Sequence, residues 1–330
     1  MRLHGRDWSR EALQARTGCL QQAFGVRRMR CEEGPEAGSD IIEVRTGAGL
    51  SFDVLPGRGL DIGRCELRGV PLAWLAPGGP QRSLDGPAGT GFLRSCAGGL
   101  LMTCGLGHVG PADAEHGLHG RIHHIPARQV VAEGRWHGDE YDLRIAGVVD
   151  EVAMFGQRLQ LTREITCRAA TNRIRVADTV ENMGGRSAEL MVLYHCNLGW
   201  PLLAPEARIR LPGSGPRPRE AGAGTIGWDA WGDPDPTCDE RVFFHDPLPS
   251  GMVEAEVVNP LLGVRLSLRW DAALLPHLVQ WHMQGHGEHV LGIEPATCSV
   301  HGHATERRNG RIIDLQPGAI WSAWLEFDAS

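Results

Sequence analysis

Two side chains suited to proton transfer stand at the ends of strand-like segments that lie far apart in the chain. Glu294 follows the apolar run VLGI, residues 290–293, and Pro295 then interrupts regular strand pairing. His195 ends an apolar run in the segment LMVLYHCN, residues 190–197. A buried carboxylate is costly unless a partner or a reaction uses it, and a histidine titrates near neutral pH. The two residues therefore predict general acid–base chemistry, with hydrogen-bonded structural side chains as the alternative.

A second group of candidates is the histidine-rich segment EHGLHGRIHHIP, residues 115–126, with His116, His119, His123 and His124. His116 and His119 have H-x-x-H spacing, but the H-E-x-x-H pattern is absent, and in an extended strand these two side chains point to opposite faces. We predict no metal here. Metal ligation by the cluster remains an alternative, beside surface or hydrogen-bonded histidines and a ligand-facing His119.

The segments that must position these residues alternate apolar and polar side chains with a period of two. In GVRLSLRW (263–270) the apolar residues occupy every second position, and WSAWLEFD (321–328) alternates in a similar way. The 44 glycines and 21 prolines punctuate such runs, and no amphipathic helices lie between them. This pattern is typical of an antiparallel all-β sandwich or barrel. One short helix is expected near the start, in SREALQAR (9–16), with Ser9 as its N-cap.

Length and charge narrow the class of protein further. Strand signals continue on both sides of the two long loops (76–91 and 211–227), so residues 1–330 are expected to form a single domain. The formal net charge is 33 − 40 = −7, which argues against nucleic acid and anionic membranes as partners.

Cysteine usage and hydropathy predict the compartment. The nine cysteines are scattered and form no C-x-x-C pair, which indicates reduced thiols. The chain begins without a secretory h-region and has no apolar run of membrane-spanning length. A cytoplasmic location is expected.

Several of these segments together resemble a known group of proteins. LHG (118–120), YHCNLG (194–199), LGIEPAT (291–297) and LQPGAIWSAWLEFD (315–328) occur in the order of the galactose mutarotase-like (aldose 1-epimerase) superfamily. The segments TGAGLSFDVLPGRGLDIGRCELRGVPLAW, GGLLMTCGL and LHGRIHHIPA are more similar to an uncharacterised aldose 1-epimerase-like branch, a domain of unknown function. The resemblance implies a large antiparallel β-supersandwich with a sugar cleft on one concave face.

The resemblance also implies catalytic roles. Glu294 is similar to the base that takes the proton from the anomeric hydroxyl, and His195 to the acid that protonates the ring oxygen. Ring opening, bond rotation and reclosure then interconvert the anomers of a sugar without a cofactor. Burial is expected to raise the pKa of Glu294 and cationic neighbours to hold it down. The two side chains are expected to face each other across a ligand-sized gap.

Substrate contacts follow from the same resemblance. His119 is similar to a second histidine that positions a sugar oxygen, Arg94 lies at about the distance of a substrate-binding arginine, and Asn197 follows the acid more closely than in mutarotases. An aromatic platform is expected from Trp200, Trp228 or Trp281.

Arg121 replaces a family glycine, and from their charge alone Arg121 or Arg58 could meet an acidic or phosphorylated sugar. The family's substrate-binding aspartate has only Asp229 and Asp233 as candidates.

Two functions of other classes remain open. One is a non-catalytic carbohydrate-binding or sensing protein on the same scaffold. The other is a metal-dependent sugar isomerase or lyase that uses the His116–His124 cluster together with Glu294.

Overall fold

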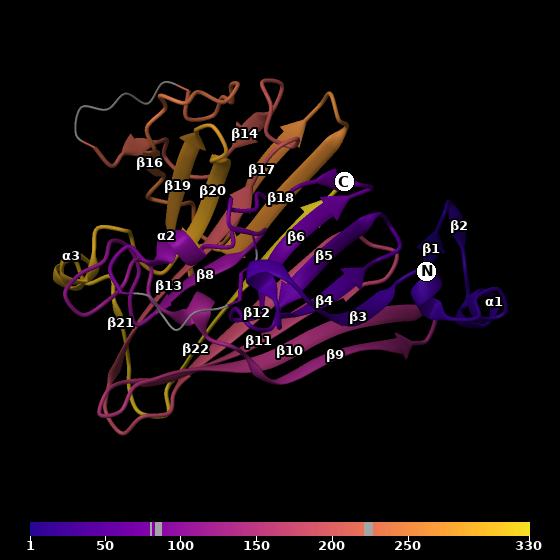
Figure 1. Cartoon of the computed structure of the whole chain (residues 1–330), viewed down its shortest axis with the longest axis horizontal. Coiled ribbons are helices and arrows are strands. Elements are labelled where there is room, and N and C mark those ends of the chain that lie inside the picture. The colour runs from indigo at the N-terminus through magenta and orange to yellow at the C-terminus, as the bar shows by residue number, and fades with distance from the viewer. Residues whose placement is uncertain (80, 83–87, 221–226) are drawn as a thin grey trace.

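Antiparallel strands make up most of the chain in the computed structural model, which describes residues 1–79, 81–82, 88–220 and 227–330. They form three large sheets and a small N-terminal hairpin (Figure 1). The prediction of an antiparallel all-β sandwich is therefore confirmed. The period-two segments 263–270 and 321–328 lie in two neighbouring strands, β18 and β22, with their apolar residues on the buried face.

The eight-stranded sheet contains, in spatial order, β14 (Arg208–Arg210), β17 (Met252–Asn259), β18 (Val264–Asp271), β22 (Ile320–Ala329), β12 (Arg173–Asn182), β11 (Arg158–Arg168), β10 (Glu140–Val152) and β9 (Arg128–His137). The seven-stranded sheet contains β15 (Arg217–Pro218), β16 (Arg241–Phe244), β19 (His277–Gln284), β20 (His289–Ala296), β13 (Ala188–Leu198) and β21 (Ile313–Leu315), with β8 (Met102–Leu106) also paired to β13. The five-stranded sheet contains β3 (Gly25–Arg30), β4 (Asp40–Arg45), β5 (Leu50–Leu55), β6 (Asp61–Leu67) and β7 (Val70–Pro71).

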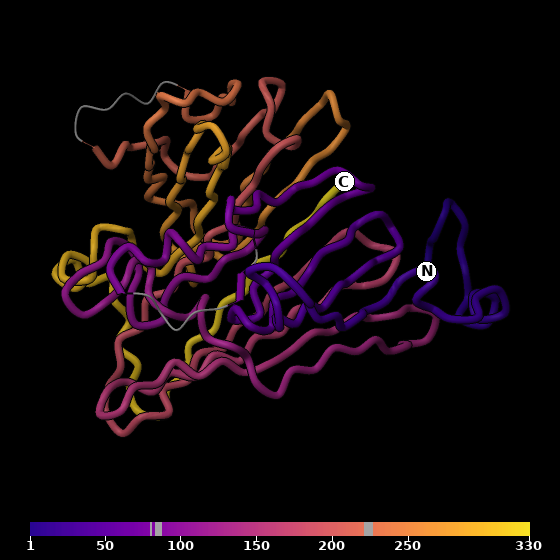
Figure 2. The backbone as a smooth tube through the Cα atoms, viewed as in Figure 1, coloured from indigo at the N-terminus to yellow at the C-terminus, as the bar shows by residue number. Residues whose placement is uncertain are grey.

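Helices are short and lie outside the sheets. The α-helices are α1 (Arg10–Gln14), α2 (Phe92–Ser95) and α3 (His303–Arg308), the 3₁₀ helices are η1 (Leu20–Gln22), η2 (Gly34–Glu36) and η3 (Ile122–His124), and the N-terminal hairpin pairs β1 (Arg2–Leu3) with β2 (Arg6–Asp7). The predicted N-terminal helix is α1, and the hydroxyl of Ser9 accepts a hydrogen bond from the backbone N–H of Ala12. Figure 2 shows α1 and α3 at opposite ends of the molecule.

One hydrophobic core joins the three large sheets. It includes Phe52 of β5, Ile165 of β11 and Val192 of β13, which are at most 1% exposed. The single domain over residues 1–330 stays a prediction. The nine cysteines are free, and in the described ranges no helix is long and apolar enough to cross a membrane.

The seven-stranded sheet has a second buried face, which points away from this core. Met191 and Leu193 of β13, Val279 of β19 and Ala296 of β20 form a separate apolar cluster there. Because side chains alternate along a strand, residues at even offsets from these positions share their face. That face therefore also receives His195 and Glu294.

Candidate active site

Strand pairing brings the predicted acid and base together. In the antiparallel ladder between β13 and β20, Leu193 pairs with Ala296 and Cys196 with Ile293. The same register sets His195 directly opposite Glu294, and cross-strand neighbours on one face of a sheet are in side-chain contact. Two residues separated widely in the chain thus become adjacent.

The carboxyl group and the imidazole are in direct contact. Nε2 of His195 lies 3.1 Å from Oε1 of Glu294, and the two residues are 6% and 2% exposed. The expectation that they face each other across a ligand-sized gap is wrong, because neighbouring strands hold them closer than a sugar ring would allow. A ligand must therefore approach the pair from its exposed edge.

Three polar atoms at this place lack hydrogen-bond partners within the part of the chain that the structure describes. They are Nδ1 of His195, Nδ1 of His119 and Oε1 of Glu294, whose 3.1 Å contact with Nε2 of His195 lacks the geometry of a hydrogen bond. The rings of His119 and His195 meet edge to face, with centroids 6.0 Å apart. Buried polar atoms are nearly always paired in folded proteins, so three unpaired atoms in one place indicate a ligand site.

Burial sets the protonation of the pair. Burial, the largest cause, and the carboxylate of Glu240 together raise the pKa of Glu294 to about 8, against the opposing effect of the Arg219 guanidinium. Burial also lowers the pKa of His195 to about 3, with a further contribution from His119. The expected balance of burial and a cationic neighbour at Glu294 is confirmed. Between these values the pair shares one proton.

Because Gly292 has no side chain, the side chains of Glu294 and His195 can occupy the space beside it. A Cβ at this position would lie 2.6 Å from Oε1 of Glu294 and 3.0 Å from Cε1 of His195. Contacts under 3.0 Å are not tolerated without a shift. A residue larger than glycine here would displace the carboxyl group.

Aromatic residues and a charged pair border the site. Trp281 of β19 lies edge to face against His195 with centroids 5.5 Å apart, and Trp74 lies against Trp281 at 6.3 Å. The indole N–H of Trp281 donates to Glu240 at 3.0 Å, and Glu240 also accepts from Arg219 at 2.9 Å. Trp281 was expected from the sequence, whereas Trp74, Glu240 and Arg219 were missed; Trp74 ends the segment 46–74 that carries the resemblance, but no motif marks Glu240 or Arg219.

Two further predicted residues lie on segments that adjoin the site. The amide nitrogen of Asn197 donates to the backbone carbonyls of Gly99 and His195, which fixes the strand that carries His195. Arg94 is exposed on α2, whose Phe92 packs against His119 with centroids 5.6 Å apart. Their contact with a ligand stays a prediction.

Other candidates lie elsewhere. Arg58 is 3% exposed and donates to the Gln81 carbonyl and to His123, while its Nη2 has no hydrogen-bond partner in the described chain, so its contact with an anionic sugar stays a prediction. The guanidinium of Arg121 acts on the buried carboxyl of Glu151, whose pKa burial raises and Arg121 lowers. The remaining candidates outside the pair are exposed or half-buried: Trp200 (70% exposed, after β13), Trp228, Asp229 and Asp233.

The four histidines of segment 115–126 do not form one cluster. His123 bonds Asp61 at 2.7 Å, His119 lies against His195, and His116 lies beside Asp113. His124 is buried next to Phe92. The alternative of a single metal site built from His116 to His124 is wrong. In the described residues the ligand atoms of His116 converge with those of none of the other three, which pack around Phe92.

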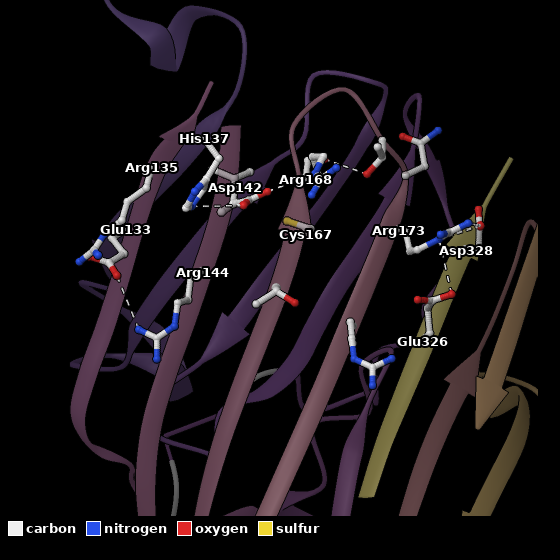
Figure 3. A pocket seen from close by; sticks show the side chains of 15 residues that line it. Glu133, Arg135, His137, Asp142, Arg144, Cys167, Arg168, Arg173, Glu326 and Asp328 are labelled. Carbon is white, nitrogen blue, oxygen red and sulfur yellow. Dashed lines mark hydrogen bonds and ion pairs between the residues drawn. The ribbon is translucent and has the colours of Figure 1, made fainter. Parts of the chain in front are cut away.

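A hollow of about 880 Å³ lies on the outer face of the eight-stranded sheet and contains none of the predicted site residues (Figure 3). Its charges are paired across strands: Arg144 lies 3.6 Å from Glu133, and Arg173 lies 2.8 Å from Asp328. Matched surface ion pairs of this kind satisfy one another. We therefore place the candidate site at Glu294 and His195 and not in this hollow.

Comparison with solved structures defines the class of fold. A protein from Klebsiella pneumoniae subsp. pneumoniae MGH 78578, named provisionally as an aldose 1-epimerase, is similar with a TM-score of 0.84 and 27% identity over 92% of this chain and 83% of its own. A galactose mutarotase-like protein from Clostridium acetobutylicum matches with a TM-score of 0.62 and 13% identity over 94% and 99% of the two chains. Galactose 1-epimerase from Lactobacillus acidophilus NCFM matches at 0.59 and 12%, over 93% and 99%. The chain has the galactose mutarotase-like fold.

Within this class the family is defined by sequence. Residues 36–329 match the family described as Domain of unknown function (DUF4432), and the chain belongs to it. No curated protein matches the chain. The resemblance predicted from the sequence, both to the superfamily and to an uncharacterised branch, is confirmed.

Proposed function

We propose that the chain is a cofactor-independent aldose 1-epimerase that interconverts the anomers of a sugar by acid–base ring opening. The observation that carries this proposal is the contact of 3.1 Å between His195 and Glu294, with unpaired polar atoms around it. The names of the structural neighbours agree with the proposed reaction.

The proton inventory of the pair suits this reaction. Ring opening needs one group that accepts the proton of the anomeric hydroxyl and one that gives a proton to the ring oxygen. The raised pKa of Glu294 and the lowered pKa of His195 place the shared proton on Glu294 in the free protein, so the pair supplies both groups once that proton has moved to His195 and Glu294 is a carboxylate. The C1–O5 bond then breaks as the carbonyl forms, the C1–C2 bond rotates, and the ring closes with the proton transfers reversed. The pair returns to its starting state without a metal or nucleotide.

The half-buried rim of the site supplies the binding groups. Trp281 and Trp74 offer apolar faces to a sugar ring, and the unpaired nitrogen of His119 offers a hydrogen bond to a sugar oxygen. Arg94, Asn197 and Arg121 remain candidates for contacts that fix which sugar is bound.

A non-catalytic carbohydrate-binding protein is the competing function. It would use the same aromatic rim, but it would not require a base with a raised pKa in contact with a second titrating group. The two functions therefore differ in what happens to a bound sugar.

Exchange NMR of aldoses distinguishes them. Neutral hexoses and pentoses, uronic acids and sugar phosphates would be tested with the wild type, Glu294→Gln and, as a control, Glu326→Gln on the outer face of the eight-stranded sheet. We expect at least one aldose to show enzyme-dependent anomer exchange that Glu294→Gln slows by about 100-fold or more and Glu326→Gln leaves unchanged. Binding of sugars without exchange in the wild type would contradict the proposal and support the binding function.

A further inference from the structure

A second cluster of ligand-type side chains lies in the loop between β8 and η3. The rings of His108 and His116 stack nearly parallel, with centroids 4.8 Å apart and an angle of 5° between them. Nδ1 of His116 lies 3.0 Å from the carboxylate of Asp113, and Nδ1 of His108 lies 4.0 Å from its other oxygen. One ligand atom from each of the three residues falls within 4.8 Å of the others. We propose that His108, Asp113 and His116 bind a divalent transition-metal ion such as Zn²⁺.

The state of His108 carries this inference. Its side chain is 1% exposed, and its Nε2 lies 2.8 Å from the carbonyl of Pro111, to which it can only donate. This tautomer leaves a lone pair on Nδ1, which has no hydrogen-bond partner in the described chain and points into the cluster. Histidines that bind metals commonly donate their other N–H to a carbonyl or carboxylate in this way.

Backbone hydrogen bonds of the loop fix the orientation of the Asp113 carboxylate. One oxygen of Asp113 accepts from the backbone N–H groups of Glu115 and His116, at 2.8 and 2.7 Å. These two backbone hydrogen bonds and the contact with His116 account for the positions of Asp113 and His116 without a metal. They do not explain the buried, unpaired nitrogen of His108 beside them.

The donor set selects the class of ion. Two imidazole nitrogens and one carboxylate suit Zn²⁺ and neighbouring transition metals, whereas Ca²⁺ and Mg²⁺ prefer oxygen ligands. Ligand atoms of a tetrahedral zinc site lie closer together than 4.8 Å, so small side-chain rotations must close this site around the ion.

His303 is placed to complete the coordination. Its ring stacks on His116 with centroids 5.3 Å apart, and its Nε2 lies 2.9 Å from the carboxylate of Glu189. That contact fixes the ring and leaves Nδ1 for an ion. The ion would then join the loop that carries His119 to α3, which follows the strand that carries Glu294.

This inference does not depend on the proposed function, because the ion would not touch His195 or Glu294. The ion would stabilise the packing of the loop that carries His119 against α3, near the candidate active site. Metal binding and anomer exchange can therefore fail separately.

Metal titration of the tag-free full-length protein tests the proposal. After treatment with a chelator, the chain would be titrated with Zn²⁺ against a chromophoric chelator and with Co²⁺ by visible absorption. We expect one ion per chain, and a melting temperature that rises with Zn²⁺. His116→Ala and Asp113→Asn should weaken Zn²⁺ binding by roughly 100-fold, since losing even an outer-shell partner costs about 10- to 100-fold. His303→Ala should weaken it by about tenfold or more.

The control is His137→Ala. It removes a histidine that lies 3.5 Å from Asp142 in a comparable pair on the outer face of the eight-stranded sheet. This variant should bind Zn²⁺ like the wild type. Absence of saturable Zn²⁺ binding in the wild type would overturn the proposal, as would equal affinity in wild type, His116→Ala and Asp113→Asn. An unchanged affinity in His303→Ala would remove His303 from the site.

Discussion

At the scale of single residues, the chemistry depends on what burial does to two titrating groups. Burial disfavours charge, so it moves the pKa of Glu294 up and that of His195 down, and each group favours its neutral form. Placed in contact, they hold one proton between them over the neutral range. Groups coupled in this way titrate as a pair, and the pair can serve as donor and acceptor at once.

The raised pKa of Glu294 predicts a pH-dependent stability cost that can be measured before any substrate is known. A group whose pKa is higher in the folded than in the unfolded state stabilises fully below the unfolded value, 4.5, and loses that contribution as the pH rises through about 8. Glu294→Gln should therefore lie within about 1 kcal/mol of the wild type near pH 5 and exceed its free energy of unfolding by about 4 kcal/mol near pH 8. Urea melts at several pH values measure this difference. A difference that does not change with pH would contradict the pKa assignment.

The shared proton also predicts the pH dependence of anomer exchange. The rate should stay level through neutral pH and fall above about pH 8, where the pair loses its proton. Two independent groups with ordinary values would instead lose activity from about pH 6.5, as the histidine deprotonates. Exchange rates measured across this range separate the two cases.

At the scale of elements, the register of one strand pair builds the site. β13 and β20 set His195 opposite Glu294, and β19 adds Trp281 beside Gly292. The loop before η3 brings His119 over the same face. The site is thus formed on the sheet itself, with a loop that covers it.

Gly292→Ala tests this arrangement. The new Cβ would press on Oε1 of Glu294 and on the ring of His195. We expect anomer exchange to fall by about 100-fold, the cost of a displacement near 1 Å, while the fold is kept. Gly185→Ala is the control, because a Cβ there meets nothing within 4 Å. Full activity in Gly292→Ala would show that the carboxyl position does not matter.

The sequence predicts the strands better than it predicts their partners. Alternation in 263–270 and 321–328 gives both strands and their buried faces. The local sequence pattern does not indicate that β13 pairs with β20, because pairing between distant strands depends on the whole sheet. Family motifs pointed to Glu294 and His195 in spite of this, but they could not reveal that the two are in contact. Glu240 lies in no motif and was missed, and Trp74 was missed although it ends the segment 46–74 that carries the resemblance.

Arg58 and the histidine segment 115–126 show a second reason why the site could not be predicted fully from the sequence. Charge and residue type suggested an exposed arginine and a grouped set of histidines. The arginine is instead buried against His123, while His116 pairs with Asp113 and the other three histidines pack around Phe92. Packing of this kind depends on tertiary contacts that a single sequence does not display.

At the scale of the molecule, a buried ionic network ties the three large sheets together. Arg163 of β11 is 0% exposed and lies 2.6 Å from Asp61 of the five-stranded sheet and 2.7 Å from Asp178 of β12. Tyr194 of the seven-stranded sheet donates to Asp178 at 2.8 Å. Because Tyr194 precedes His195 on β13, the network also anchors the strand that carries the proposed acid.

Arg163→Met should therefore destabilise the whole fold. It leaves two buried carboxylates without their cation, which costs about 3–5 kcal/mol in comparable buried pairs. Arg173→Met, which breaks a surface pair with Asp328, should cost less than about 1 kcal/mol. Urea unfolding of both variants gives the comparison, and similar losses in the two would argue against a special role for the network.

The most direct test of the central claim is a cycle of Glu294→Gln, His195→Gln and the double variant, read as the rate of anomer exchange. If the two residues act as one proton-transfer unit, each single change abolishes most of the acceleration and the double variant is little slower than either, as for other catalytic groups that act together. Losses that multiply in the double variant would show two independent contributions. Retention of exchange in Glu294→Gln would contradict the account outright.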